Sequence, residues 1–168
     1  MLGIMARIYI FVTAALFALT SPGAESTNWP PAGFVEVRAY LYNLEGDQAA
    51  PILKQGTLQA SVWNPKGAEL SKPQIATVQK AVADYHPEGL RVGASCYRPR
   101  HAFVYYDAKH KPVGFVEICF SCWGYRTSPE HSGEVDLETL KKVFAELKMP
   151  VFDKDEAYLS LKKRKTKQ

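Results

Sequence analysis

The sequence lacks the short motifs that identify many enzyme classes. It has no Walker phosphate loop, no dinucleotide-binding glycine fingerprint, no His-Glu-x-x-His zinc motif and no nucleophile elbow. Glycine and proline are modest, at 11 residues each among 168, which excludes collagen-like repeats, and a hydrophobic fraction of 46% excludes a disordered chain. We therefore expect one folded domain of ordinary size that has no enzymatic turnover.

Long apolar runs are also scarce, and the clearest one lies at the N-terminus. Ile8–Leu19 is apolar, follows the positive charge of Arg7, and precedes small residues up to Ala24. This order is typical of a secretory signal peptide, and the run is too short to cross a membrane comfortably. We expect residues 1–24 to be removed, and the remaining chain to be periplasmic or secreted, without stable membrane anchoring.

The surplus of positive charge is confined to the C-terminus. The chain has 21 Lys and Arg against 17 Asp and Glu, and five of the positive residues lie in 162–168. Without that segment and residues 1–24, the body carries 15 positive and 17 negative side chains. No predicted helix combines a basic face with aromatic residues, so we expect no nucleic-acid partner. The predicted organisation is a domain over 25–161 and a basic tail over 162–168.

Hydrophobic periodicity predicts an α+β domain. Alternating apolar residues indicate strands, and apolar residues at helical spacing after a capping residue indicate helices. The strands are expected at 34–43, 57–64, 101–107 and 112–120, and the helices at 71–85, 136–147 and, as a short C-terminal helix, 153–161. Residues 120–135 have no clear period and are expected to be a loop. The order strand–strand–helix, twice, predicts a mostly antiparallel four-stranded sheet with two helices on one face.

The second pair of strands is expected to form a hairpin around Asp107-Ala-Lys-His110. The turn predicts a left-handed conformation at His110, where glycine or asparagine is commoner. A register that pairs Asp107 with Lys111 sets His101 opposite Glu117 and places both on one face with Cys119. A slip by one residue would instead separate these side chains onto opposite faces.

Three cysteines and a histidine are the candidate functional residues. A structural disulfide would join Cys96 to Cys122 or to Cys119 and leave one thiol over, as is common in an oxidising compartment. Alternatively, Cys96, His101, Cys119 and Cys122 would be four ligands of zinc, with copper(I) equally suited to the soft sulfur atoms.

Two catalytic interpretations of the same residues stay open. Cys119-x-x-Cys122 is a spacing used by redox-active thiol pairs, with Cys96 as a resolving thiol, although no helix is predicted to begin there. A cysteine hydrolase would use His101 as its base and Glu117 to orient it, but the sequence offers no oxyanion-binding element. The plain alternative for His101 is a structural contact across the strands.

The cysteine-containing segment resembles a family of small exported bacterial proteins of unassigned function. The shared pattern is a cysteine, then Pro-Arg-His, a hydrophobic strand that ends near Asp, and a Cys-Phe-x-Cys exit. In this chain the pattern runs from Cys96 through Pro99-Arg-His101 and Asp107 to Cys119-Phe-Ser-Cys122, and His110 stands where such proteins often have glycine. The resemblance implies that Cys96, His101, Cys119 and Cys122 matter, and it implies no activity.

These observations lead to one expected function and two alternatives. We expect a small exported binding or structural protein whose cluster of Cys96, His101, Cys119 and Cys122 is a disulfide or a metal site, with a protein or a metal ion as its partner. The first alternative is a thiol–disulfide redox protein. The second is an inhibitor or immunity-type binding module of the cell envelope.

Overall fold

The fold combines a mostly antiparallel sheet with three helices. The computed structural model describes residues 29–44, 50–83, 97–131 and 133–165, so the predicted signal peptide lies outside the described residues. The elements are β1 Glu36–Leu41, β2 Leu53–Lys54, β3 Thr57–Leu58, β4 Ala68–Glu69, α1 Lys72–Ala83, β5 His101–Tyr106, β6 Pro112–Cys119, β7 Gly124–Ser128, α2 Leu137–Glu146 and α3 Asp155–Lys165.

The main sheet has the strand order β4-β1-β5-β6-β7, and every neighbouring pair is antiparallel. The predicted α+β class and antiparallel sheet are confirmed, but the sheet has five strands rather than four. The strand expected at 57–64 is reduced to β3, which pairs only with β2 in a separate two-stranded sheet. β7 occupies part of the segment expected to be a loop, because Gly124-Tyr-Arg-Thr-Ser128 carries no alternation of apolar residues.

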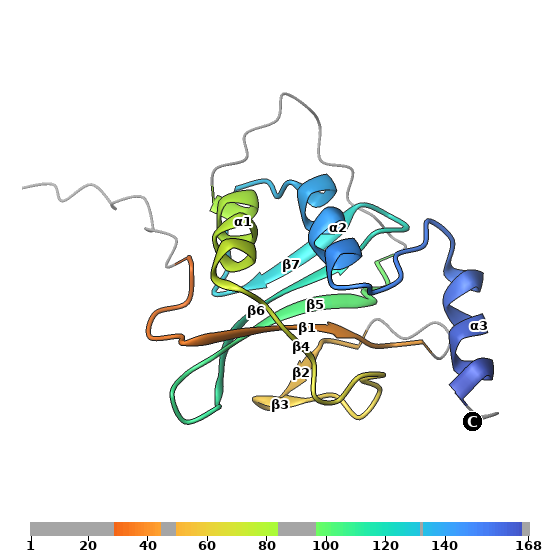
Figure 1. The fold of residues 1–168 in the computed structure, drawn as a ribbon, viewed down its shortest axis with the longest axis horizontal. Coiled ribbons are helices and arrows are strands. Elements are labelled where there is room, and N and C mark those ends of the chain that lie inside the picture. Colours follow the sequence, from red (N-terminus) through yellow and green to blue (C-terminus); the bar gives the residue numbers. More distant parts are fainter. Residues whose placement is uncertain (1–28, 45–49, 84–96, 132, 166–168) are drawn as a thin grey trace, which may run out of the picture.

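Both faces of the main sheet are covered, by different kinds of structure. Figure 1 shows α1 and α2 on one side of the sheet and the β2–β3 hairpin on the other. The alternation predicted for β1 is confirmed, since Val37, Ala39 and Leu41 join the core on the helix side and Tyr40 joins the second core under the hairpin.

Two of the helices begin where the sequence predicts. The Gln74 side chain accepts a hydrogen bond from the Ser71 backbone N–H at 3.0 Å, which is the predicted capping box before α1. Asp136 caps α2 by accepting from the Thr139 backbone N–H at 3.0 Å. α3 continues past Leu161 to Lys165, into the segment predicted as a tail. Within the described residues no helix is long and apolar enough to span a membrane.

The β5–β6 hairpin confirms the predicted turn and corrects the predicted register. His110 has a φ of 57°, and the Asp107 N–H donates to the Lys111 carbonyl at 3.0 Å, as expected. A β-bulge then shifts the pairing between Tyr105 and Tyr106, so that His101 lies opposite Ile118 instead of Glu117. The bulge lies at the start of β6, where Pro112 has no N–H to give to the ladder.

Gly114 is required where β6 passes between β7 and the N-terminal segment. A Cβ atom there would overlap the side chain of Pro31 and the backbone oxygen of Ser128. We expect Gly114→Ala to lower the free energy of unfolding by about 1–3 kcal/mol, because a backbone atom cannot move aside as a side chain can. Urea unfolding monitored by tryptophan fluorescence measures the change. The exposed Lys109→Ala is the control, and an equal effect of the two variants would contradict the steric argument.

Candidate functional site

The structure describes three of the four predicted site residues, and it brings Cys119 and Cys122 together and places His101 apart from them. Cys96 lies outside the described residues. His101 begins β5, Cys119 ends β6, and Cys122 lies in the turn that leads into β7. Because paired residues of antiparallel strands share a face, His101 shares its face with Ile118, and the next residue, Cys119, points to the opposite face. The prediction that His101, Glu117 and Cys119 share one face is therefore wrong, and the bulge in the hairpin is the reason.

His101 is a buried structural side chain on the helix side. Its ring is 0% exposed, lies against the rings of Phe120, Phe144 and Tyr158, and its Nε2 is 3.0 Å from the Pro150 carbonyl oxygen. Burial lowers the pKa of His101 from 6.5 to about 4, so the imidazole is neutral at physiological pH.

The ligand positions that the structure describes do not form a metal site by themselves. Among the described residues, no three His, Cys, Asp or Glu side chains come together in a way that could hold a metal ion. The predicted set of Cys96, His101, Cys119 and Cys122 depends on Cys96, and it stays a prediction. The same holds for a disulfide from Cys96 to Cys122 or Cys119.

Cys119 and Cys122 meet at the end of β6. The Cys122 sulfur and the Cys119 sulfur are 2.6 Å apart. Cys119 is a buried free thiol, whereas Cys122 is half-buried. Two further polar groups contact the Cys119 sulfur, because the Arg98 backbone N–H lies at 3.4 Å and the Ser121 hydroxyl at 3.3 Å.

Glu117 is a fully buried carboxylate on the same face as Cys119. Its Oε2 accepts from the Ile52 backbone N–H at 2.9 Å and from the Tyr42 hydroxyl at 3.2 Å. Its Oε1 accepts from the Tyr97 hydroxyl at 3.3 Å and forms an ion pair with Arg126. A buried charge persists when it is paired and its lone pairs accept hydrogen bonds, and Glu117 meets both conditions.

The two tyrosines remain hydrogen-bond donors because they do not ionise at physiological pH. Burial, followed by the neighbouring carboxylate of Glu117, raises the pKa of Tyr42 and of Tyr97 well above the usual value of 10.0. Cys119 adds to the rise of the pKa at Tyr97. The ring of Tyr97 also fills the space beside Gly124, where a Cβ atom would lie 2.9 Å from it.

An exposed aromatic side chain follows the thiol pair. Trp123 is 52% exposed and adopts a φ of 53°, and the Lys141 ammonium group lies 6.0 Å from the centre of its ring. Single exposed apolar side chains are ordinary on a protein surface, and Trp is enriched among residues that contribute most to protein–protein binding. Trp123 therefore gives the more accessible sulfur, that of Cys122, an apolar neighbour.

Several members of this site were not among the residues predicted from the sequence. Tyr97 and Arg126 hold Glu117, and the Ser121 hydroxyl contacts Cys119. The sequence does contain one signal for these residues. Glu117 interrupts the apolar run Val116-Glu-Ile-Cys119 at a position where burial is expected, and a buried carboxylate requires a cation and hydrogen-bond donors nearby. The cation is identified only by the register of β6 with β7, which pairs Glu117 with Arg126.

Chemically, the arrangement is a pair of adjacent thiols beside a buried charged network. The more accessible sulfur can react with an external thiol or disulfide, and the buried sulfur can leave or attack as a thiolate. The oxygen atoms of the Glu117 carboxylate are contacted by four donors, from Tyr42, Ile52, Tyr97 and Arg126, which makes it a structural anchor. Comparisons with protein families, with curated proteins and with solved structures find no match for this chain.

Proposed function

We propose that this chain is an exported thiol–disulfide redox protein in which Cys119 and Cys122 are the reacting pair. The observation that carries the proposal is the contact of the two sulfur atoms, 2.6 Å apart, at a turn where Cys119 is buried and Cys122 is half-buried. The predicted signal peptide over 1–24 supports export to a compartment in which disulfides persist. The exposed Trp123 beside the pair offers an apolar contact to a substrate protein.

The unequal burial of the two sulfur atoms assigns their roles. In the oxidised protein, Cys119 and Cys122 share a disulfide, and a thiolate of a substrate dithiol attacks the accessible Cys122 sulfur. A new S–S bond forms between the substrate and Cys122, the Cys119–Cys122 bond breaks, and Cys119 leaves as a thiolate. The Arg98 N–H and the Ser121 hydroxyl stabilise the negative charge of that leaving group.

The second half of the reaction completes the transfer of two electrons. The remaining substrate thiolate attacks the substrate sulfur of the mixed disulfide, which forms the substrate's own disulfide and releases the Cys122 thiolate. Cys119 and Cys122 each take up one of the two protons that the substrate thiols lose. A small disulfide such as oxidised glutathione then reoxidises the pair by the reverse steps, and is itself reduced to two thiols.

The proposal is tested on protein exported with its own leader and purified from the periplasm of an expression host. The protein is equilibrated in buffers of reduced and oxidised glutathione, quenched with acid, and its thiols are counted by maleimide labelling and mass spectrometry. We expect a single two-electron transition that survives in Cys96→Ser and is lost in Cys119→Ser and in Cys122→Ser. A transition lost in Cys96→Ser, or zinc bound to the native protein, would overturn the assignment.

Ser121→Ala tests the role of the hydroxyl without removing a thiol. We expect its disulfide to be opened by reduced glutathione about three- to tenfold more slowly than that of the wild type, because the leaving thiolate loses one donor. The matched control is Ser160→Ala, since the Ser160 hydroxyl donates only within α3, to the Ala157 carbonyl. Stopped-flow mixing with glutathione, monitored by Trp123 fluorescence, gives both rates, and equal rates would contradict the assigned leaving group.

A further inference from the structure

A cavity of about 520 Å³ lies on the face of the sheet that is turned away from α1 and α2. Its walls come from β1, β3, β5, the β5–β6 turn and the loop before β4, so that five separate segments meet around it. The volume falls within the range of small-molecule binding sites, about 300–1,000 Å³. The thiol pair and its redox chemistry do not use this cavity.

Two tyrosine hydroxyls in the wall leave one hydrogen without an acceptor. The hydroxyls of Tyr40 and Tyr106 lie 2.7 Å apart, and both side chains are almost completely buried. Each hydroxyl has one hydrogen, and their mutual bond uses only one of the two. The other hydrogen therefore requires an acceptor, and the cavity that both residues line is where one can be supplied.

The tyrosine pair keeps both hydrogens under physiological conditions. Burial is the main cause that raises the pKa of Tyr40, and burial together with the Tyr40 hydroxyl raises the pKa of Tyr106. Neither phenol ionises near neutral pH, so the pair presents a donor and never a negative charge. A ligand that meets it must bring an oxygen with lone pairs.

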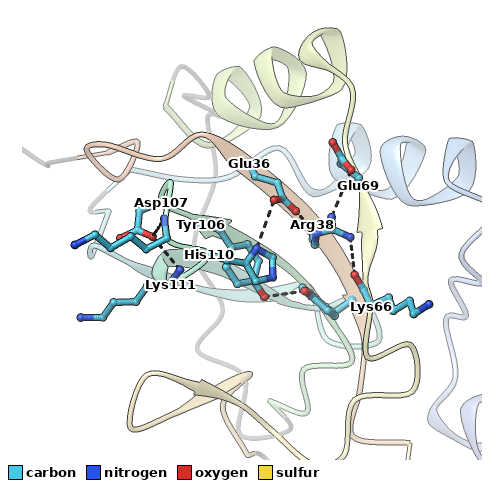
Figure 2. A network of polar contacts seen from close by, with 10 residues as sticks. Glu36, Arg38, Lys66, Glu69, Tyr106, Asp107, His110 and Lys111 are labelled. Carbon is cyan, nitrogen blue, oxygen red and sulfur yellow. Dashed lines mark hydrogen bonds and ion pairs between the residues drawn. The ribbon is translucent and has the colours of Figure 1, made fainter.

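The charged side chains in the cavity wall are positive. Among the described residues that line it, Arg38 and Lys66 are permanent cations and no carboxylate is present. Figure 2 shows the Arg38 guanidinium held from outside by Glu36, by Glu69 at 3.4 Å and by the Lys66 carbonyl at 2.7 Å. These three contacts fix the group and leave two of its five N–H bonds for a ligand.

Apart from Gly56 and Thr57, the rest of the wall is apolar or aromatic. Leu58, Pro65 and Pro112 line the cavity, and the ring of His110 stacks on Tyr106 with 4.5 Å between the ring centres, as Figure 2 shows. The His110 ring is in turn placed by Glu36, whose Oε2 is 3.5 Å from its Nδ1. A ligand that fills the cavity must therefore combine an anionic oxygen group with a compact apolar body.

We propose that this cavity is a binding site for a small organic acid with an apolar or aromatic body. The carboxylate accepts the spare hydrogen of the Tyr40–Tyr106 pair and hydrogen bonds from the remaining N–H groups of Arg38, whose charge Glu36 and Glu69 already balance. It also faces the charge of Lys66. Its apolar part lies between the proline rings and Leu58. The proposed binding site lies on the face of the main sheet that carries Tyr40, and it does not depend on whether the thiol pair is redox-active.

The test uses benzoate as the probe and benzamide as its neutral analogue of nearly equal shape. Each is titrated into ¹⁵N-labelled full-length protein while the backbone amide shifts are followed. We expect benzoate to shift the amides of Leu58, Tyr106 and His110 saturably, with a Kd at or below about 1 mM, and benzamide to bind at least tenfold more weakly. Amides around Cys122 are expected to stay unshifted.

Substitutions in the cavity wall test which residues bind the carboxylate of the probe. The double change Tyr40→Phe with Tyr106→Phe keeps both rings and removes both hydroxyls, and we expect it to weaken benzoate binding about tenfold. The control is Tyr105→Phe, because the Tyr105 hydroxyl is buried among residues of the opposite core. Lys66→Met, at an exposed position, is expected to weaken benzoate and not benzamide. Non-saturable shifts, equal affinity for the two probes, or full binding by the double variant overturns the proposal.

Discussion

Replacing Glu117 with alanine is expected to lower the free energy of unfolding by about 3–5 kcal/mol. The change removes the acceptor of the Ile52 N–H and of the Tyr42 hydroxyl, and both donors are buried away from solvent. Each unpaired buried donor costs about 1–3 kcal/mol, and the empty volume of the side chain adds to the loss. Urea unfolding at neutral pH gives the value.

Two milder variants separate charge from hydrogen bonding. Glu117→Gln keeps the volume and one acceptor oxygen, and we expect it to lose about half as much stability as Glu117→Ala. Arg126 is 48% exposed, so in Glu117→Ala its guanidinium can be hydrated by solvent and does not become an unpaired buried charge. Tyr97→Phe removes one donor and is expected to lose about 1 kcal/mol. A loss below about 1 kcal/mol in Glu117→Ala would contradict the anchoring role.

The helix face of the fold could be predicted from residues close together in the sequence. Alternation assigned Val37, Ala39 and Leu41 to one core, and Asp136 marked the start of α2. These features depend on neighbours within a few positions, which a pattern in the sequence reports directly. The same reasoning found the left-handed His110, because the turn residues and the strand lengths together demanded it.

The candidate site depended on features that a local pattern does not report. A single bulge near Pro112 moved His101 to the face opposite Glu117 and Cys119, since side chains alternate with a period of two. β7 has little apolar alternation, and it forms because its backbone can pair with the free edge of β6. This pairing brings Arg126 beside Glu117. The spacing of Cys119 and Cys122 suggested a thiol pair, but only the fold decided that one sulfur is buried and the other accessible.

His101 is expected to make the protein less stable in mild acid. Its pKa is about 4 in the folded protein, where burial opposes the charge, and about 6.5 in the unfolded chain. Above pH 6.5 the imidazole is neutral in both states and contributes no pH dependence. As the pH falls from 6.5 to 4, the unfolded chain binds a proton that the folded protein does not, so stability is lost. The full effect is about 3 kcal/mol, reached near pH 4 and constant below it.

His101→Gln isolates this titration from that of the carboxylates. The Gln amide can donate to the Pro150 carbonyl as the Nε2–H does, and it carries no charge at any of these pH values. The nearby cation is Arg100, which also opposes protonation of the ring and is unchanged in the variant. Urea unfolding of both proteins from pH 7.5 to 3.5 measures the difference in the free energy of unfolding.

The free energy of unfolding of the wild type, relative to that of His101→Gln, should fall by about 3 kcal/mol between pH 6.5 and 4. A difference that stays constant across that range would mean that the imidazole takes up its proton within the folded protein, and that its apolar surroundings of Phe120, Phe144 and Tyr158 do not exclude the charge.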